Sequence, residues 1–172
     1  MGDYGAADID ELLNMDVRFP VRVDMQGLFP AISGFEQWHP GVAYALIKSG
    51  VESWWWGGAQ YLTLRPESPK RVEVWVFLCK SGRYVLQYMS NAEPIGVWYL
   101  TDPAQLVLDS SGEDWAYCGG NPIPIAPAGT VGWEVVWEAV AFLFLSGLRH
   151  PALSWTEQHA LEEDFGPILG EP

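Results

Sequence analysis

Carboxylates are the most abundant potentially reactive groups in this chain, and most of them have no basic residue nearby in the sequence. The 172 residues include 22 Asp and Glu against 9 Lys and Arg, which gives a formal net charge of −13. Twelve of these acids, but only one base, follow Arg83. Paired carboxylates can act as general acid and base, as in glycosidases, but with so many acids no particular pair stands out. A field of one sign over half a chain instead indicates a cationic partner.

The three histidines lack the spacing of a metal site. His39, His150 and His159 are far apart in the sequence, and only His159 has neighbouring carboxylates, Glu162 and Glu163, within one helical turn. This group lies in a polar tail, where a solvated surface is expected. Structural zinc sites use closely spaced Cys and His pairs. We therefore predict no metal ion and no cofactor.

Nucleophile motifs are also missing from the sequence. Cys79 lies in an apolar run and is predicted to be a small core residue. Cys118 precedes two glycines, and no Lys or Arg lies between Arg83 and Arg149 to lower the pKa of its thiol. The chain contains neither a Gly-x-Ser-x-Gly elbow nor a Gly-rich loop followed by Lys-Ser or Lys-Thr. We expect no catalytic residue and no enzymatic activity.

The charge balance argues against nucleic acid and membranes as direct partners. Phosphate contacts require Lys and Arg clustered on one face, although a carboxylate surface could still mimic DNA. No apolar stretch approaches the 18 residues of a membrane helix. The N-terminus lacks the basic and apolar regions of a signal peptide. The sequence therefore predicts a cytoplasmic protein that does not contact membranes or bind nucleic acid directly.

Tryptophan is unusually frequent, with ten residues, three of them consecutive. Neighbouring residues of a strand point to opposite faces, so at least one of the three should be exposed or lie against a partner. They could form a core-and-rim cluster, anchor an interface or stack on sugars. A further Trp follows two carboxylates, an arrangement that suits a surface meeting Arg and Lys. The predicted partner-binding residues are Trp54, Trp55, Trp56, Asp109, Glu113, Asp114 and Trp115.

The hydropathy pattern predicts an antiparallel sheet of five or six strands in the middle of the chain. Strands are expected at residues 61–65, 71–78, 84–89 and 96–100, and short or extended segments at 19–23, 106–108, 114–117, 123–125 and 152–155. In the segment 71–78, alternation places one set of side chains on each face. Gly82 is available for a positive φ in the turn at residues 80–83. The apolar set comprises Val72, Val74, Val76 and Leu78, and the other comprises Arg71, Glu73, Trp75 and Phe77.

One long helix is predicted at residues 131–146. Thr130 is a candidate N-cap, Glu134 lies in the first turn, and Gly147 ends the helix. Shorter helices are expected at residues 41–49, before the sheet, and at 9–13. We predict one α+β domain over residues 1–172, with mobile ends at 1–20 and 157–172, or a surface turn of helix in the latter. The apolar face of the long helix comprises Val135, Val136, Ala139, Val140, Phe142 and Leu143.

The end of this long helix carries a family resemblance. It finishes in Phe, and a small residue, Gly, a basic residue, Pro and a closing Trp follow within residues 144–155. This stretch resembles the end of immunity protein family one, a family of bacterial polymorphic-toxin antidotes often encoded beside deaminase-type toxins. The predicted meander at residues 61–100 is similar to the centre of the family, so the resemblance covers residues 61–155.

The resemblance implies an α+β fold that inhibits by binding and carries no catalytic residue. Gly147 and Pro151 would stop the helix, and Trp155 would anchor a strand. We expect a monomer that forms a 1:1 heterodimer with a nucleic-acid-modifying toxin domain and occludes its basic active site. An acidic secretion chaperone for a basic effector, and an enzyme with an unrecognised site, remain alternatives.

Overall fold

The described part of the chain forms an antiparallel sheet of six strands. The computed structural model describes residues 21–27, 59–67, 71–92, 94–104, 114–118, 121–165 and 167–169. The strand order is β1-β2-β3-β4-β5-β8, so the first five strands form a meander and the last joins at the β5 edge. This confirms the predicted α+β class and antiparallel sheet. The strands are β1 (Val21–Gly27), β2 (Ala59–Pro66), β3 (Val72–Leu78), β4 (Tyr84–Ser90), β5 (Gly96–Leu100) and β8 (Trp155–Glu157).

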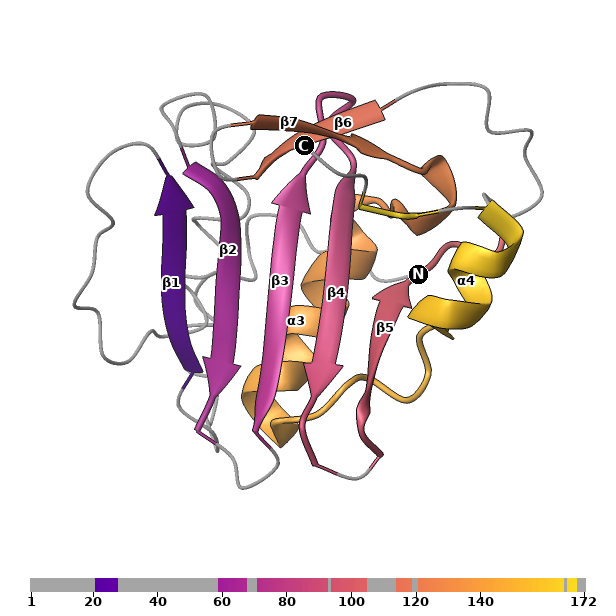
Figure 1. Cartoon of the computed structure of the whole chain (residues 1–172). Coiled ribbons are helices and arrows are strands. Elements are labelled where there is room, and N and C mark those ends of the chain that lie inside the picture. The colour runs from indigo at the N-terminus through magenta and orange to yellow at the C-terminus, as the bar shows by residue number, and fades with distance from the viewer. Residues whose placement is uncertain are drawn as a thin grey trace.

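Both faces of this sheet carry other elements. Helix α3 (Trp133–Ser146) lies behind the sheet in Figure 1. A hairpin of β6 (Asp114–Cys118) and β7 (Asn121–Ile125) lies across the end at which β3 finishes. A 3₁₀ turn, η2 (Pro127–Gly129), leads from the hairpin towards α3, and α4 (Gln158–Phe165) follows β8. The fold is therefore layered, with the sheet in the middle.

Two hydrophobic cores fill the spaces between the layers. The core beneath α3 contains alternate residues of β3 and β4 and the inner face of the helix. The second core joins the opposite face of the sheet to the hairpin, α4 and the C-terminal segment. Its buried members are Phe77, Cys79, Val85, Tyr99, Ala116, Ile123, Ile125, Ala128, Leu161 and Ile168.

The second core explains why burial in β3 does not simply alternate. Val74 and Val76 share one face, as predicted, and both are buried on the α3 side. Phe77 belongs to the opposite set, yet its exposed fraction is 0% because the hairpin and its neighbours cover this end of the sheet. The following turn contains Gly82 with a φ of 82°, which confirms the prediction of a positive φ.

The beginning of α3 differs from the sequence prediction. The helix starts at Trp133 with Gly132 as its N-cap, not at Val131 with Thr130 as the cap. The Thr130 hydroxyl instead donates to the Pro127 carbonyl (2.8 Å) and accepts from Arg83 Nε (2.8 Å). The Thr130 side chain, which the local sequence pattern predicts as the cap of α3, therefore binds the turn between β3 and β4 through Arg83.

The end of α3 agrees with the prediction. Gly147 has a φ of 68°, in the left-handed region, and its backbone N–H donates to the Leu143 carbonyl. This is the usual geometry of a glycine C-cap. The chain then turns at Pro151 and returns as β8 at Trp155, three residues later than the predicted strand start.

The segment that follows residue 157 belongs to the fold. It forms α4, and it places Leu161 and Ile168 in the second core with exposed fractions of 2% and 0%. Leu169 also pairs with Ile125 of the hairpin. The predicted helices at 9–13 and 41–49 and the strand at 106–108 lie outside the described residues.

Candidate functional site

The structure describes two of the seven predicted partner-binding residues, Asp114 and Trp115. Both open β6, beside the turn that joins β3 to β4. Both side chains are partly exposed. The other five lie outside the described residues: Trp54, Trp55, Trp56, Asp109 and Glu113.

Asp114 is bonded to the β3–β4 turn. Its Oδ1 accepts the backbone N–H of Ser81 at 3.2 Å and that of Trp115 at 2.9 Å. Its Oδ2 accepts the Ser81 hydroxyl. Because both carboxylate oxygens accept hydrogen bonds within the fold, this residue helps to hold the turn as well as contributing charge to the surface.

Trp115 is joined to the same turn through Lys80. The Lys80 backbone N–H donates to the Trp115 carbonyl at 2.9 Å, and Lys80 Nζ lies 5.3 Å from the centre of the indole ring. This distance is within the range of a cation–π contact. The indole predicted to meet a partner's cation therefore already has a cation of its own chain beside it.

Cys79, at the start of this turn, is buried. Burial raises the pKa of its thiol well above its usual value of 9.0, and the nearby Asp114 carboxylate raises it further. The thiolate is the nucleophilic form of cysteine, so Cys79 has the character of a core residue, as predicted.

A second group of carboxylates lies on β8 and α4. Glu157, Glu163 and Asp164 are exposed, and Glu162 is partly buried. Their contacts are with neutral or weakly basic side chains: Gln158 donates to Glu162 at 2.9 Å, and His159 Nε2 lies 3.2 Å from Glu163. We call Glu157, Glu162, Glu163 and Asp164 the acidic edge.

The acidic edge is not among the partner-binding residues that the sequence predicts. Its charge was visible in the run 162–164, but the surrounding segment was predicted to be a mobile end or a surface turn of helix. In the structure, α4 holds these carboxylates in place, because Leu161 of the same helix is buried in the second core.

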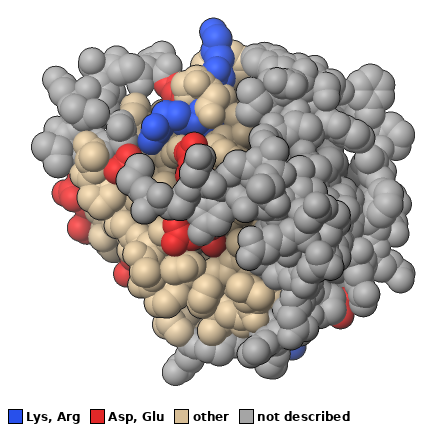
Figure 2. Space-filling model, turned by 180° about the vertical axis from the view of Figure 1, so that it is seen from behind, with Lys and Arg blue, Asp and Glu red and all other residues tan. Residues whose placement is uncertain are grey.

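The described carboxylates of the second half form no ion pair with a described Lys or Arg. Eight of the twelve acids after Arg83 are described, and none of them forms an ion pair with Lys or Arg in this part of the chain. Glu138 instead lies 3.6 Å from His150. Figure 2 shows red atoms along the left side and in the middle of the described surface, and most of the blue atoms at its upper end. The eight acids are Asp102, Asp114, Glu134, Glu138, Glu157, Glu162, Glu163 and Asp164.

The described residues were also compared with the features of a metal centre and of a membrane helix. Among them, no group of three or more His, Cys, Asp or Glu residues is arranged to hold a metal ion. Within the same residues, no helix has both the length and the apolar character needed to cross a bilayer.

Comparisons of the chain with protein-family models, curated proteins and solved structures give no match. The resemblance to immunity protein family one therefore stays a prediction based on the sequence.

Proposed function

We propose that this chain is an immunity protein that binds a cognate bacterial toxin domain and occludes its basic active site. The observation that carries the proposal is the set of eight described carboxylates without a Lys or Arg partner. The resemblance of residues 132–155 to the end of immunity protein family one supplies the class of partner.

The uncompensated charge has a physical cost in the free chain. Like charges on one surface repel each other and slightly destabilise the compact state. A basic partner removes this repulsion and is attracted from a distance, which can raise the association rate by orders of magnitude at low salt. A toxin that acts on nucleic acid is such a partner, because its substrate channel must attract phosphates.

The acidic edge is suited to such a role because the fold holds it in place. Glu163 and Asp164 project from a helix whose Leu161 is 2% exposed, and β8 pairs with β5 through Leu100 and Trp155. Charges on a fixed scaffold lose less conformational freedom on binding than charges on a free tail. Asp114 and Trp115 add a second, smaller contact region.

The test of this function begins with the neighbouring reading frame in the source genome. A large neighbouring gene with a variable C-terminal domain would supply the candidate toxin. That domain, expressed in a laboratory bacterium, should stop growth, and co-expression of this chain should restore growth. Purified proteins should form a 1:1 complex in light scattering. A toxic neighbour that is neither bound nor neutralised would contradict the proposal.

The electrostatic part of the proposal is tested with two matched charge reversals. Glu163→Lys lies on the acidic edge, whereas Glu67→Lys changes an exposed Glu after β2. We expect Glu163→Lys to lower the association rate several-fold at low salt and Glu67→Lys to change it much less. The difference should shrink as salt is raised, because screening shortens the reach of the field. An association rate that is equal at low and high salt would contradict this part.

A further inference from the structure

Arg149 is the single Lys or Arg residue after Arg83, and it does not pair with the acids around it. Its neighbour His150 contacts Glu138, at 3.6 Å. No ion pair joins Arg149 to a carboxylate within the described residues. A solitary cation in an acidic half of a protein, left unpaired, needs a physical explanation.

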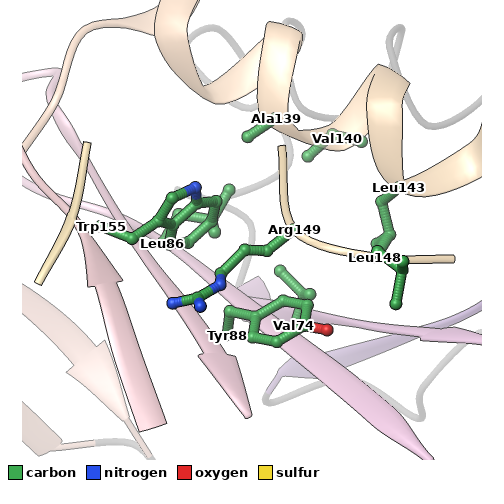
Figure 3. Close-up of a pocket in the computed structure, with 9 residues that line it drawn as sticks. All are labelled: Val74, Leu86, Tyr88, Ala139, Val140, Leu143, Leu148, Arg149 and Trp155. Atoms are coloured by element: carbon green, nitrogen blue, oxygen red, sulfur yellow. The ribbon is translucent and has the colours of Figure 1, made fainter. Parts of the chain in front are cut away.

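Aromatic rings hold the Arg149 side chain in place. Its guanidinium carbon lies 4.2 Å from the centre of the Trp98 ring and 5.9 Å from that of Tyr88. Tyr88 in turn contacts both Trp98 and Trp155, with ring centres 6.0 and 5.9 Å apart. Figure 3 shows the Arg149 side chain extending over Tyr88, with Trp155 beyond it. We call Tyr88, Trp98 and Trp155 the aromatic support of Arg149.

The contact with the rings leaves the N–H donors of the Arg149 side chain available. A guanidinium stacks through its flat faces, while its five N–H donors lie in the plane and match a carboxylate. No described residue accepts a hydrogen bond from the Arg149 side chain. The support therefore contacts the cation without using its N–H donors.

The pocket beside Arg149 limits the kind of ligand. Its lining is otherwise mostly aliphatic, from β3, β4, α3 and Leu148, and its cavity volume is about 10 Å³, which is space for about one water molecule. Small-molecule sites usually enclose about 300–1,000 Å³. A free ligand would bury too little surface here, whereas a carboxylate on a protein gains its affinity elsewhere in the interface.

We propose that Arg149 receives one carboxylate of the partner protein, either an Asp or Glu side chain or a C-terminus. This inference rests on the proposed function in one respect, namely that the partner is a protein. Arg149 would then help to fix the register of the complex, since it is the single Lys or Arg in the acidic second half and a carboxylate of the partner is favoured beside it.

The binding of a carboxylate by Arg149 can be tested on the free chain. Acetate is titrated into ¹⁵N-labelled protein at constant ionic strength, and the Nε–Hε signals of the six arginines are followed. The Arg149 signal is identified by its loss in Arg149→Lys. We expect a saturable acetate shift that is larger for Arg149 than for any other arginine, and no such shift with acetamide. A shift that is equal at all arginines, or absent at Arg149, would overturn the proposal.

The role in the complex is tested with Arg149→Gln and the matched control Arg65→Gln, since Arg65 already pairs with Glu73 at 2.7 Å. Arg149→Gln makes the chain more acidic, so the overall field predicts tighter binding to a basic toxin. The proposed site predicts the opposite, a loss of affinity of about 10- to 100-fold, the range for a charge-assisted hydrogen bond. Arg65→Gln should leave affinity nearly unchanged.

These two experiments separate the further inference from the proposed function. If Arg149 shows the selective acetate shift but the toxic neighbour is neither bound nor neutralised, the immunity function is rejected and the carboxylate-binding role of Arg149 is retained. A purely structural role would lower the melting temperature of Arg149→Gln, leave toxin affinity unchanged or improved, and give no selective acetate shift. That pattern would overturn the inference.

Discussion

Ser81 and Asp114 are 33 residues apart in the sequence, and two hydrogen bonds join them. One bond comes from the Ser81 backbone N–H at 3.2 Å, and the other comes from its hydroxyl. The pair ties the β3–β4 turn to the first residue of β6. An acid predicted from its neighbours to face a partner is therefore also part of the fold.

This pair should show measurable coupling in a double-mutant cycle. We expect Ser81→Ala and Asp114→Ala each to lower the free energy of unfolding by about 1 kcal/mol, the typical net contribution of a hydrogen bond. The double variant should lose less than the sum of the two. Urea denaturation measures all three values, and the exposed Asp164→Ala should change stability by less than about 0.5 kcal/mol. Strictly additive losses would show that the two side chains act independently.

Glu73 should contribute a pH-dependent part of the stability. Burial alone raises its pKa, but hydrogen bonds from Arg65 and Trp75 and the Arg65 charge outweigh burial and hold the pKa below its ordinary value of 4.5. A group with a lowered folded-state pKa stabilises the fold above its unfolded pKa, and this stabilisation is lost as the pH falls through the folded pKa.

The measurement compares the wild-type chain with Glu73→Gln. We expect the difference in unfolding free energy to be constant from about pH 7 to pH 5 and to shrink towards about pH 3. Since Arg65 is half exposed, the difference should stay below about 1 kcal/mol. Glu67→Gln serves as a control with the same chemical change. A difference that grows on acidification would contradict the assigned direction of the shift.

Cys79 should be unreactive in the folded protein. In a Cys118→Ser variant it is the sole thiol, and burial raises its pKa above the ordinary 9.0. We expect a thiol reagent to modify it at least about 100-fold more slowly than free cysteine at neutral pH, because reaction requires opening of the core. Urea at the unfolding midpoint should abolish this protection. Rapid labelling of the native chain would place the thiol outside the core.

Gly129 and Ile168 test whether the C-terminal segment packs on η2. A Cβ added at Gly129 would overlap Ile168 Cγ2. Gly129→Ala should therefore destabilise the protein by about 1–3 kcal/mol. Leucine lacks the β-branch methyl, so the same change should cost less in an Ile168→Leu background. Thermal unfolding of the four proteins gives the answer, and an equal cost in both backgrounds would contradict this packing.

The main elements follow from patterns that are local in the sequence. Alternation in residues 71–78 predicts β3 because a strand repeats every two residues, and Gly147 marks the end of α3 because a left-handed C-cap favours glycine. The β5 bounds, Gly96–Leu100, also agree with the prediction. These features depend on backbone geometry within a few residues.

Less of the candidate site can be predicted from local sequence patterns. The charge asymmetry was visible in composition, and Asp114 and Trp115 were selected because they adjoin each other. Their contacts with Ser81 and Lys80 could not be predicted, since hydrogen bonds between residues more than 30 positions apart leave no periodic signal. The aromatic support of Arg149 comes from β4, β5 and β8, and contacts between these separate strands also leave no periodic signal in the sequence.

Composition and local periodicity thus determine the acidic character of the second half, the strands of the meander and the end of the long helix. Tertiary structure decides which faces are covered and which charges stay unpaired. Phe77 is buried because the distant β6–β7 hairpin covers it, Thr130 contacts Arg83 and does not cap α3, and Arg149 lies against rings in place of carboxylates. In each case the deciding contact joins segments that only folding brings together.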